Sequence, residues 1–225
     1  MRRVKGVLPF KTWGGARPGA GRKPKGEKAG VRHAARAPMA TRYPAHVTVK
    51  VRKGLPRLRR AREYAVLRGA FAAGCERGGF RLVHYAVLND HLHLLVEGGR
   101  EAVVRGVQGL LIRVAKALNK LWGRKGSVFG DRYHDHVLKT PREVRMAVRY
   151  VLTNGWKHAR QAGAREGAVP LDMFTSGPWF DGWREAITVR GLEGEARPVA
   201  GARTWLLSVG WRRGGLLSVY ERAAG

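Results

Sequence analysis

The stretch Asn89-Asp90-His91-Leu92-His93-Leu94-Leu95-Val96 sets two histidines, one residue apart, in an apolar run. A β-strand points successive side chains to opposite faces, so His91 and His93 share one face and the intervening apolar residues share the other. The apolar face predicts burial against a core. Two neutral imidazoles on one face can hold a divalent ion. The stretch therefore predicts a strand that carries a candidate metal site.

Regular patterns on either side of this strand predict an α+β fold. Residues 46–51 alternate strictly with valines on one face, and residues 80–88 form an apolar strand that reaches the histidine strand through a tight turn. Helical spacing of apolar residues follows Pro56 and again Gly99. Residues 127–138 read as a last, polar strand. The order β-α-β-β-α-β predicts a ferredoxin-like antiparallel sheet with helices on one face.

A further helix begins at Thr140-Pro141-Arg142-Glu143. The threonine can cap this helix, the proline suits its first turn, and the glutamate completes a capping box. Its apolar helical spacing ends at Gly155. Tyr150 and Asn154 are four residues apart, so they are neighbours along one edge of the apolar stripe. This helix adds a phenol and an amide to the candidate chemistry.

The chain is strongly basic: 44 Lys and Arg stand against 16 Asp and Glu in 225 residues, a formal net charge of +28. Such a surplus predicts a polyanionic partner, and nucleic acid is the expected one, because neutralising phosphates releases counterions. Cys75 is the only cysteine, which excludes an intrachain disulfide and a Cys-based zinc site. No signal-peptide core and no apolar run of roughly 20 residues occurs. We therefore expect a soluble, cytoplasmic protein with no membrane partner.

Composition divides the chain into three predicted parts. Residues 1–40 hold eleven Lys and Arg against a single acid and show no period, which predicts a disordered basic arm that binds DNA; the alternative is a solvated tail with diffuse attraction to phosphate. Residues 41–160 contain the regular patterns and form the main domain. Residues 161–225 form a smaller, tryptophan-rich basic appendage, whose tryptophans we expect to pack rather than to contact DNA. The candidate DNA contacts of the arm are Arg17, Arg22, Lys23 and Lys25.

Residues 46–158 resemble the single-tyrosine HUH transposases, and most closely the REP-associated tyrosine transposases of bacterial chromosomes. The resemblance rests on four segments, which are HVTV at 46–49, LNDHLHLLV at 88–96, FGDRYHDH at 129–136 and YVLTN at 150–154. A His-x-His triplet alone is a weak signal. The triplet followed by a Tyr-x-x-x-Asn helix at this separation is a strong one.

The resemblance implies a metal-dependent single-stranded DNA endonuclease and strand transferase that acts on hairpin-forming DNA through a covalent 5′-phosphotyrosine. It implies Tyr150 as the nucleophile and His91, His93 and Asn154 as metal ligands. Magnesium or manganese is the expected ion, because an amide oxygen and water suit harder ions, although two histidines leave zinc open. Such enzymes can share active sites across a dimer, so a homodimer stays open. The resemblance also implies a bacterial, nucleoid-associated protein.

Other polar residues of the patterned region are candidate DNA contacts or groups that orient the ligands. The DNA-binding candidates are His46, Arg132, His134 and His136, and His84 and Tyr85 are weaker candidates for either role. An ordinary position on a sheet face is an equally good interpretation of His46, His84 and Tyr85.

Three alternatives stay open. The segment Tyr133-His134-Asp135-His136 contains a second His-x-His pair and a second tyrosine, so Tyr133 is a less favoured candidate nucleophile. The His46-Val47-Thr48 segment has the form used by phosphoesterases with two such motifs, but no second copy occurs. The third alternative is a catalytically inactive, basic nucleic-acid-binding protein derived from a transposase. The presence of every residue that the chemistry requires favours an active enzyme.

Overall fold

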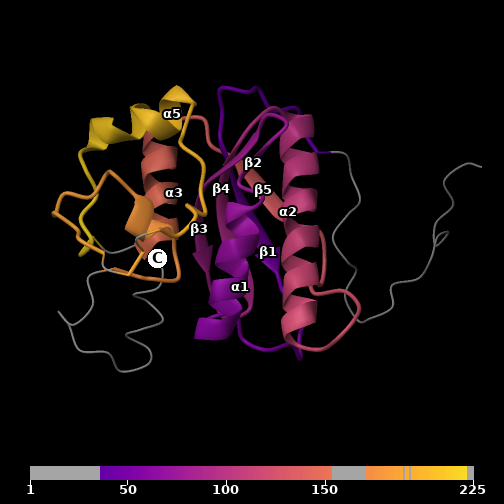
Figure 1. Cartoon of the computed structure of the whole chain (residues 1–225). Helices are drawn as coiled ribbons and strands as arrows, with labels where there is room; N and C mark the ends of the chain where they lie inside the picture. Colours follow the sequence, from indigo (N-terminus) through magenta and orange to yellow (C-terminus); the bar gives the residue numbers. More distant parts are fainter. Residues whose placement is uncertain (1–35, 154–170, 190, 193, 222–225) are drawn as a thin grey trace, which may run out of the picture. The chain divides into compact units, whose positions relative to one another are not determined.

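The computed structural model describes residues 36–153, 171–189, 191–192 and 194–221 (Figure 1). In chain order the elements are β1 (Ala45–Lys50), α1 (Ala61–Ala72), β2 (Glu76–Arg77), β3 (Phe80–Val87), β4 (His91–Glu97), α2 (Arg100–Leu121), β5 (His134–Val137), α3 (Pro141–Thr153), η1 (Gly177–Trp179), α5 (Trp205–Ser208) and η2 (Gly210–Gly214). The predicted order is present, with the two-residue strand β2 inserted before β3. In this part of the chain, no helix is both long and apolar enough to cross a membrane.

The five strands form one sheet in the order β2-β3-β4-β1-β5, and every neighbouring pair is antiparallel. Strand β1 lies between β4 and β5, so it pairs Thr48 with His93 on one side and His46 with His136 on the other. Residues paired in this way carry their side chains on the same face of the sheet. The predicted α+β, ferredoxin-like sheet is confirmed.

The two faces of the sheet have different covers, as Figure 1 shows. Helices α1 and α2 cover one face and pack on Leu92, Leu94 and Val96 of β4. Helix α3 and the C-terminal segment cover the other face and pack on Leu95. Leu92, Leu94 and Val96 therefore lie on the face opposite the histidines, as the alternation predicted, whereas Leu95 shares the face of His91 and His93, which α3 covers.

Two element boundaries differ from the sequence prediction. Gly78 and Gly79 do not end the first helix, which stops at Ala72; with φ of 53° and 80° they form the turn of the β2–β3 hairpin. The last strand is shorter than residues 127–138, because only β5 forms a continuous ladder and Phe129 meets Val51 in an isolated bridge. Residues 130–133 lie outside the ladder that β5 forms with β1.

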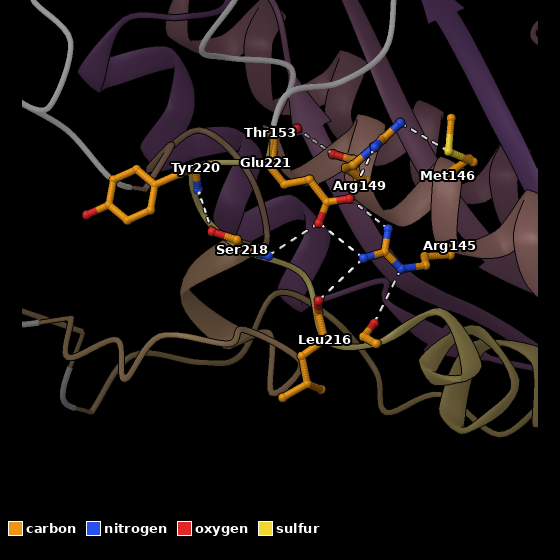
Figure 2. A network of polar contacts seen from close by, with 9 residues as sticks. Arg145, Met146, Arg149, Thr153, Leu216, Ser218, Tyr220 and Glu221 are labelled. Carbon is orange, nitrogen blue, oxygen red and sulfur yellow. Dashed lines mark hydrogen bonds and ion pairs between the residues drawn. The ribbon is translucent and has the colours of Figure 1, made fainter.

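The predicted capping box is present at the start of α3. The Glu143 amide donates to Thr140 Oγ1 at 3.2 Å, and the Thr140 amide donates to the Glu143 carboxylate at 3.1 Å. Farther along α3, Arg145 and Arg149 bond to Glu221, which belongs to the C-terminal segment (Figure 2). Helix α3 is thus stabilised at its first turn by its own capping box and farther along by the distant residue Glu221.

The described residues between 171 and 221 form the C-terminal segment, which builds much of the second core. Trp183 and Trp211 are buried there beside Phe180, whereas Trp205 is 49% exposed. Gly182 is required at this point, since a Cβ on it would come within 2.3 Å of the Trp211 ring. Two of these tryptophans therefore pack as expected. The division at residues 40 and 160 remains a prediction.

Candidate active site

The sheet gathers histidines from three strands on the face that α3 covers. His93 is paired with Thr48 and His91 with Lys50 across the β1–β4 ladder. His46 lies two residues before Thr48, so it shares that face. Because β1 is hydrogen-bonded to both β4 and β5, the backbones hold these side chains in a fixed register.

Tyr150 on α3 reaches this face from above. Its hydroxyl lies 3.4 Å from His93 Nε2, and the two rings meet edge to face with centroids 5.0 Å apart. The His91 ring stands 4.8 Å from that of His93. The structure therefore brings together the predicted histidine pair and the predicted tyrosine from elements about sixty residues apart in sequence.

The second ring nitrogen of His93 also has partners. Nδ1 lies 3.0 Å from His46 Nε2 and 3.2 Å from Thr48 Oγ1. Burial, with His46 and His91 nearby, lowers the pKa of His93 to about 3, and burial lowers the pKa of His46 to about 4. Both imidazoles are therefore neutral near pH 7, which is the form that binds a metal ion.

His91 has the arrangement typical of a metal-binding histidine. Its Nδ1–H donates to the Asp90 carboxylate at 2.7 Å, and this hydrogen bond lowers the pKa of Asp90. A carboxylate on one ring nitrogen fixes the ring and leaves the other nitrogen for the ion. His91 Nε2 and His93 Nε2 are thus the two nitrogens that fit a divalent cation.

Among the described residues, the candidate metal ligands are these two imidazoles. No group of three or more His, Cys, Asp or Glu side chains in the described ranges could hold a metal ion. The third predicted ligand, Asn154, lies outside the described residues, one position beyond the end of α3. Two histidines complemented by an amide and water still fit a divalent ion chemically.

Among solved structures, the chain is similar to a REP-associated tyrosine transposase bound to a REP hairpin, with 20% identity and a TM-score of 0.46 over 56% of this chain and 74% of that one. It is also similar to a provisionally assigned transposase from Deinococcus radiodurans R1, with 15% identity and a TM-score of 0.37 over 61% and 99% of the two chains. No family model and no curated protein matches the chain.

The predicted DNA contacts are distributed over several surfaces. His134 and His136 are exposed on the edge strand β5, and their pairing with Thr48 and His46 sets them on the face of the candidate site. Arg132 instead lines a groove beside Gln108 of α2, on the other side of the sheet. The arm residues Arg17, Arg22, Lys23 and Lys25 lie outside the described residues.

Tyr133, the less favoured nucleophile, is turned away from the histidines. It packs with the α1–α2 core, and the Arg36 guanidinium lies 3.7 Å from its ring centroid. Its hydroxyl is buried without a hydrogen-bond partner among the described residues. The alternation of β5 explains this position, because Asp135, two residues later, pairs with the core residue Val47.

His84 and Tyr85 do not reach the candidate site. His84 lies under Phe180, with Nδ1 3.3 Å from Ser176 Oγ, and Tyr85 shares a 2.9 Å hydrogen bond with the hydroxyl of Tyr64 in the α1–α2 core. Both side chains are buried. Thr48, in contrast, is a residue of the site that the sequence prediction lacks, and its strand position two residues after His46 is the signal for it.

Proposed function

We propose that this chain is a transposase-like, metal-dependent single-stranded DNA endonuclease and strand transferase that acts through a covalent 5′-phosphotyrosine on hairpin-forming repeats. The observation that carries the proposal is the 3.4 Å separation between the Tyr150 hydroxyl and His93 Nε2, with His91 alongside. A phenol held beside two neutral imidazoles is the combination that a metal-assisted tyrosine nucleophile requires.

His91 and His93 would hold the ion, and Asn154 is proposed as a third ligand. When bound, Mg²⁺ or Mn²⁺ supplies positive charge that neutralises the phosphate oxygens and favours the deprotonated phenol. The residues themselves orient the reacting groups: β4 fixes the spacing of the imidazoles, and α3 holds the phenol above them. A nucleophile that the fold already orients lowers the activation barrier, because the entropy of positioning it was lost during folding.

In the proposed reaction the Tyr150 oxygen attacks a phosphorus atom of the DNA strand. A phosphorus–tyrosine oxygen bond forms, the bond to the 3′ oxygen breaks, the phenolic proton passes to solvent, and the leaving 3′ oxygen takes up a proton. A 3′-hydroxyl of another strand then reverses these steps and releases Tyr150. The bond energy is conserved in the phosphotyrosine, so no nucleotide cofactor is needed.

Tyr150 and His93 belong to one chain, which supports an active site that is complete within a single protomer. His134 and His136, exposed on β5, are proposed to line the path of the strand beside His46. Arg132, on the other face of the sheet, and the basic arm are proposed as further contacts with DNA. A formal net charge of +28 supports strong, sequence-independent contact with phosphates.

Covalent capture tests the proposal. Hairpin oligonucleotides labelled at the 3′ end are incubated with the protein and Mg²⁺ or Mn²⁺ and run on a denaturing gel, because a 5′-phosphotyrosine retains the fragment that carries the 3′ label. The expected result is an adduct that chelation abolishes and that Tyr150→Phe removes. Tyr133→Phe is the matched control and should still form it. Capture by Tyr150→Phe would refute the assignment, and tight binding without any adduct would favour a DNA-binding protein that does not cleave.

A further inference from the structure

The His93 imidazole is engaged at both ring nitrogens. His46 Nε2 and Thr48 Oγ1 approach Nδ1 at 3.0 and 3.2 Å, and the Tyr150 hydroxyl approaches Nε2 at 3.4 Å. A neutral imidazole carries one proton, so one nitrogen donates and the other accepts. The groups around Nδ1 therefore decide whether Nε2 offers a lone pair or a hydrogen.

We propose that His46 and Thr48 are positioning residues that keep the His93 proton on Nδ1, so that the Nε2 lone pair faces Tyr150 and the divalent ion. This inference rests on the proposed function for the role of Nε2. Thr48 thereby belongs to the site, and His46 has an orienting role beside its proposed place along the path of the DNA strand.

Both neighbours can serve the Nδ1–H form. The Thr48 hydroxyl can accept a hydrogen bond from Nδ1–H while its own hydrogen turns elsewhere, and His46 Nε2 can accept one when His46 carries its proton on Nδ1. The single Nδ1–H can be shared between the two acceptors, so the loss of either one weakens the preference for this tautomer. If Nδ1 were instead the acceptor, Nε2–H would point at the Tyr150 oxygen and could not bind an ion.

The backbone supports this arrangement. Thr48 is the direct cross-strand partner of His93, and His46 is two residues away on the same face. Strand β1 is itself paired on both edges, with β4 and β5. Acceptors on an interior strand are held more firmly than acceptors on a loop. Hydrogen-bond partners of this kind orient metal-binding histidines in general, and their loss typically weakens metal affinity about 10- to 100-fold.

The tautomer can be observed directly in the metal-free protein. Long-range ¹H–¹⁵N spectra of ¹⁵N-labelled protein distinguish a protonated ring nitrogen from one with a lone pair. The expected spectrum shows His93 with a protonated Nδ1 and an unprotonated Nε2. A His93 that is protonated at Nε2 overturns the inference.

Substitution of both acceptors tests their role. In Thr48→Val with His46→Phe, the His93 proton should move towards Nε2, and Mn²⁺ affinity measured by calorimetry should fall about 10- to 100-fold. Each single variant should show a smaller shift, because one acceptor remains. Thr41→Val makes the same chemical change at an exposed position outside the site and should change neither quantity.

The outcome does not depend on a complete enzyme. If the double variant fails to fold, the single variants decide, since an unchanged tautomer ratio and unchanged Mn²⁺ affinity in both would refute a positioning role. Absence of a DNA adduct would count against the proposed function, while the tautomer would still be measured. Conversely, adduct formation by a protein whose His93 is protonated at Nε2 would reject this inference alone.

Discussion

The Glu221 carboxylate accepts two hydrogen bonds from the Arg145 guanidinium, at 2.7 and 3.1 Å, and a third from Arg149 at 3.1 Å (Figure 2). The hydrogen bond from Arg145 is the main cause of a lowered pKa at Glu221. Both arginines belong to α3, the helix that carries Tyr150. The C-terminal segment is therefore tied to the helix on which the proposed nucleophile stands.

Glu221→Gln should destabilise the fold by about 1 to 2 kcal/mol, because two partly buried guanidinium groups lose their counter-charge. Urea unfolding at neutral pH measures this change. Glu101→Gln is the matched control. Glu101 pairs with Arg105 four residues later on α2, and both side chains are about four-fifths exposed. Loss of this ion pair should therefore lower the free energy of unfolding by less than about 0.5 kcal/mol. Equal effects of the two substitutions would contradict a structural role for Glu221.

Affinity for single-stranded DNA should fall steeply with salt, and removal of residues 1–35 should reduce both the affinity and the slope. Each phosphate contact contributes about 0.7 to the logarithmic slope on single strands. Fluorescence anisotropy between low and physiological salt gives the slope. Substitution of Arg22, Lys23 and Lys25 by alanine should act in the same direction. Neutralising Lys116 and Lys120 of α2 instead provides a comparison, and a larger effect there would reassign the DNA surface.

Stability should decrease as the pH falls from about 6.5 to 4, in part because of His84. Burial lowers the pKa of His84 to about 4, with Asp181 and Arg197 as its charged neighbours, so the unfolded chain takes up this proton first. The stabilisation is complete above the unfolded pKa of about 6.5 and is lost, by up to ~3 kcal/mol, as pH falls through that window.

Unfolding at pH 7 and pH 4.5 tests the contribution of His84. His84→Gln should lose less stability between the two pH values than the unmodified protein. His134→Gln, at an exposed position on β5, serves as the control and should lose as much as the unmodified protein. If the pH dependence of stability in His84→Gln were unchanged, His84 would not be a cause of the loss of stability at low pH.

Two glycines of α2 should respond oppositely to alanine. A Cβ on Gly106 would lie 2.0 Å from the Phe80 ring of β3, so Gly106→Ala should cost about 1 to 3 kcal/mol of stability. A Cβ on Gly109 meets no atom within 4 Å, and Gly109→Ala should add about 0.5 to 1 kcal/mol through helix propensity. Thermal unfolding of both variants checks the prediction, and a stabilising Gly106→Ala would contradict the packing of α2 on β3.

The elements and their faces were largely predictable from local patterns. The alternation around His91 and His93, the capping box of α3 and the spacing of Tyr150 each depend on residues within one or two turns or strand repeats. Such signals are local, so they can be interpreted without knowledge of the rest of the chain. The boundaries of the elements were predicted less well: Gly78 and Gly79 form a hairpin turn, because β2 pairs with β3.

Tertiary structure alone decided which of these residues meet. The sequence by itself determined that two histidines share a strand face and that a tyrosine follows on a capped helix. Long-range pairing then set Thr48 opposite His93, turned Tyr133 towards the other core and brought Tyr150 to His93. The physical reason is that strand register and helix packing are fixed by burial of the two cores, which joins residues that no local period connects.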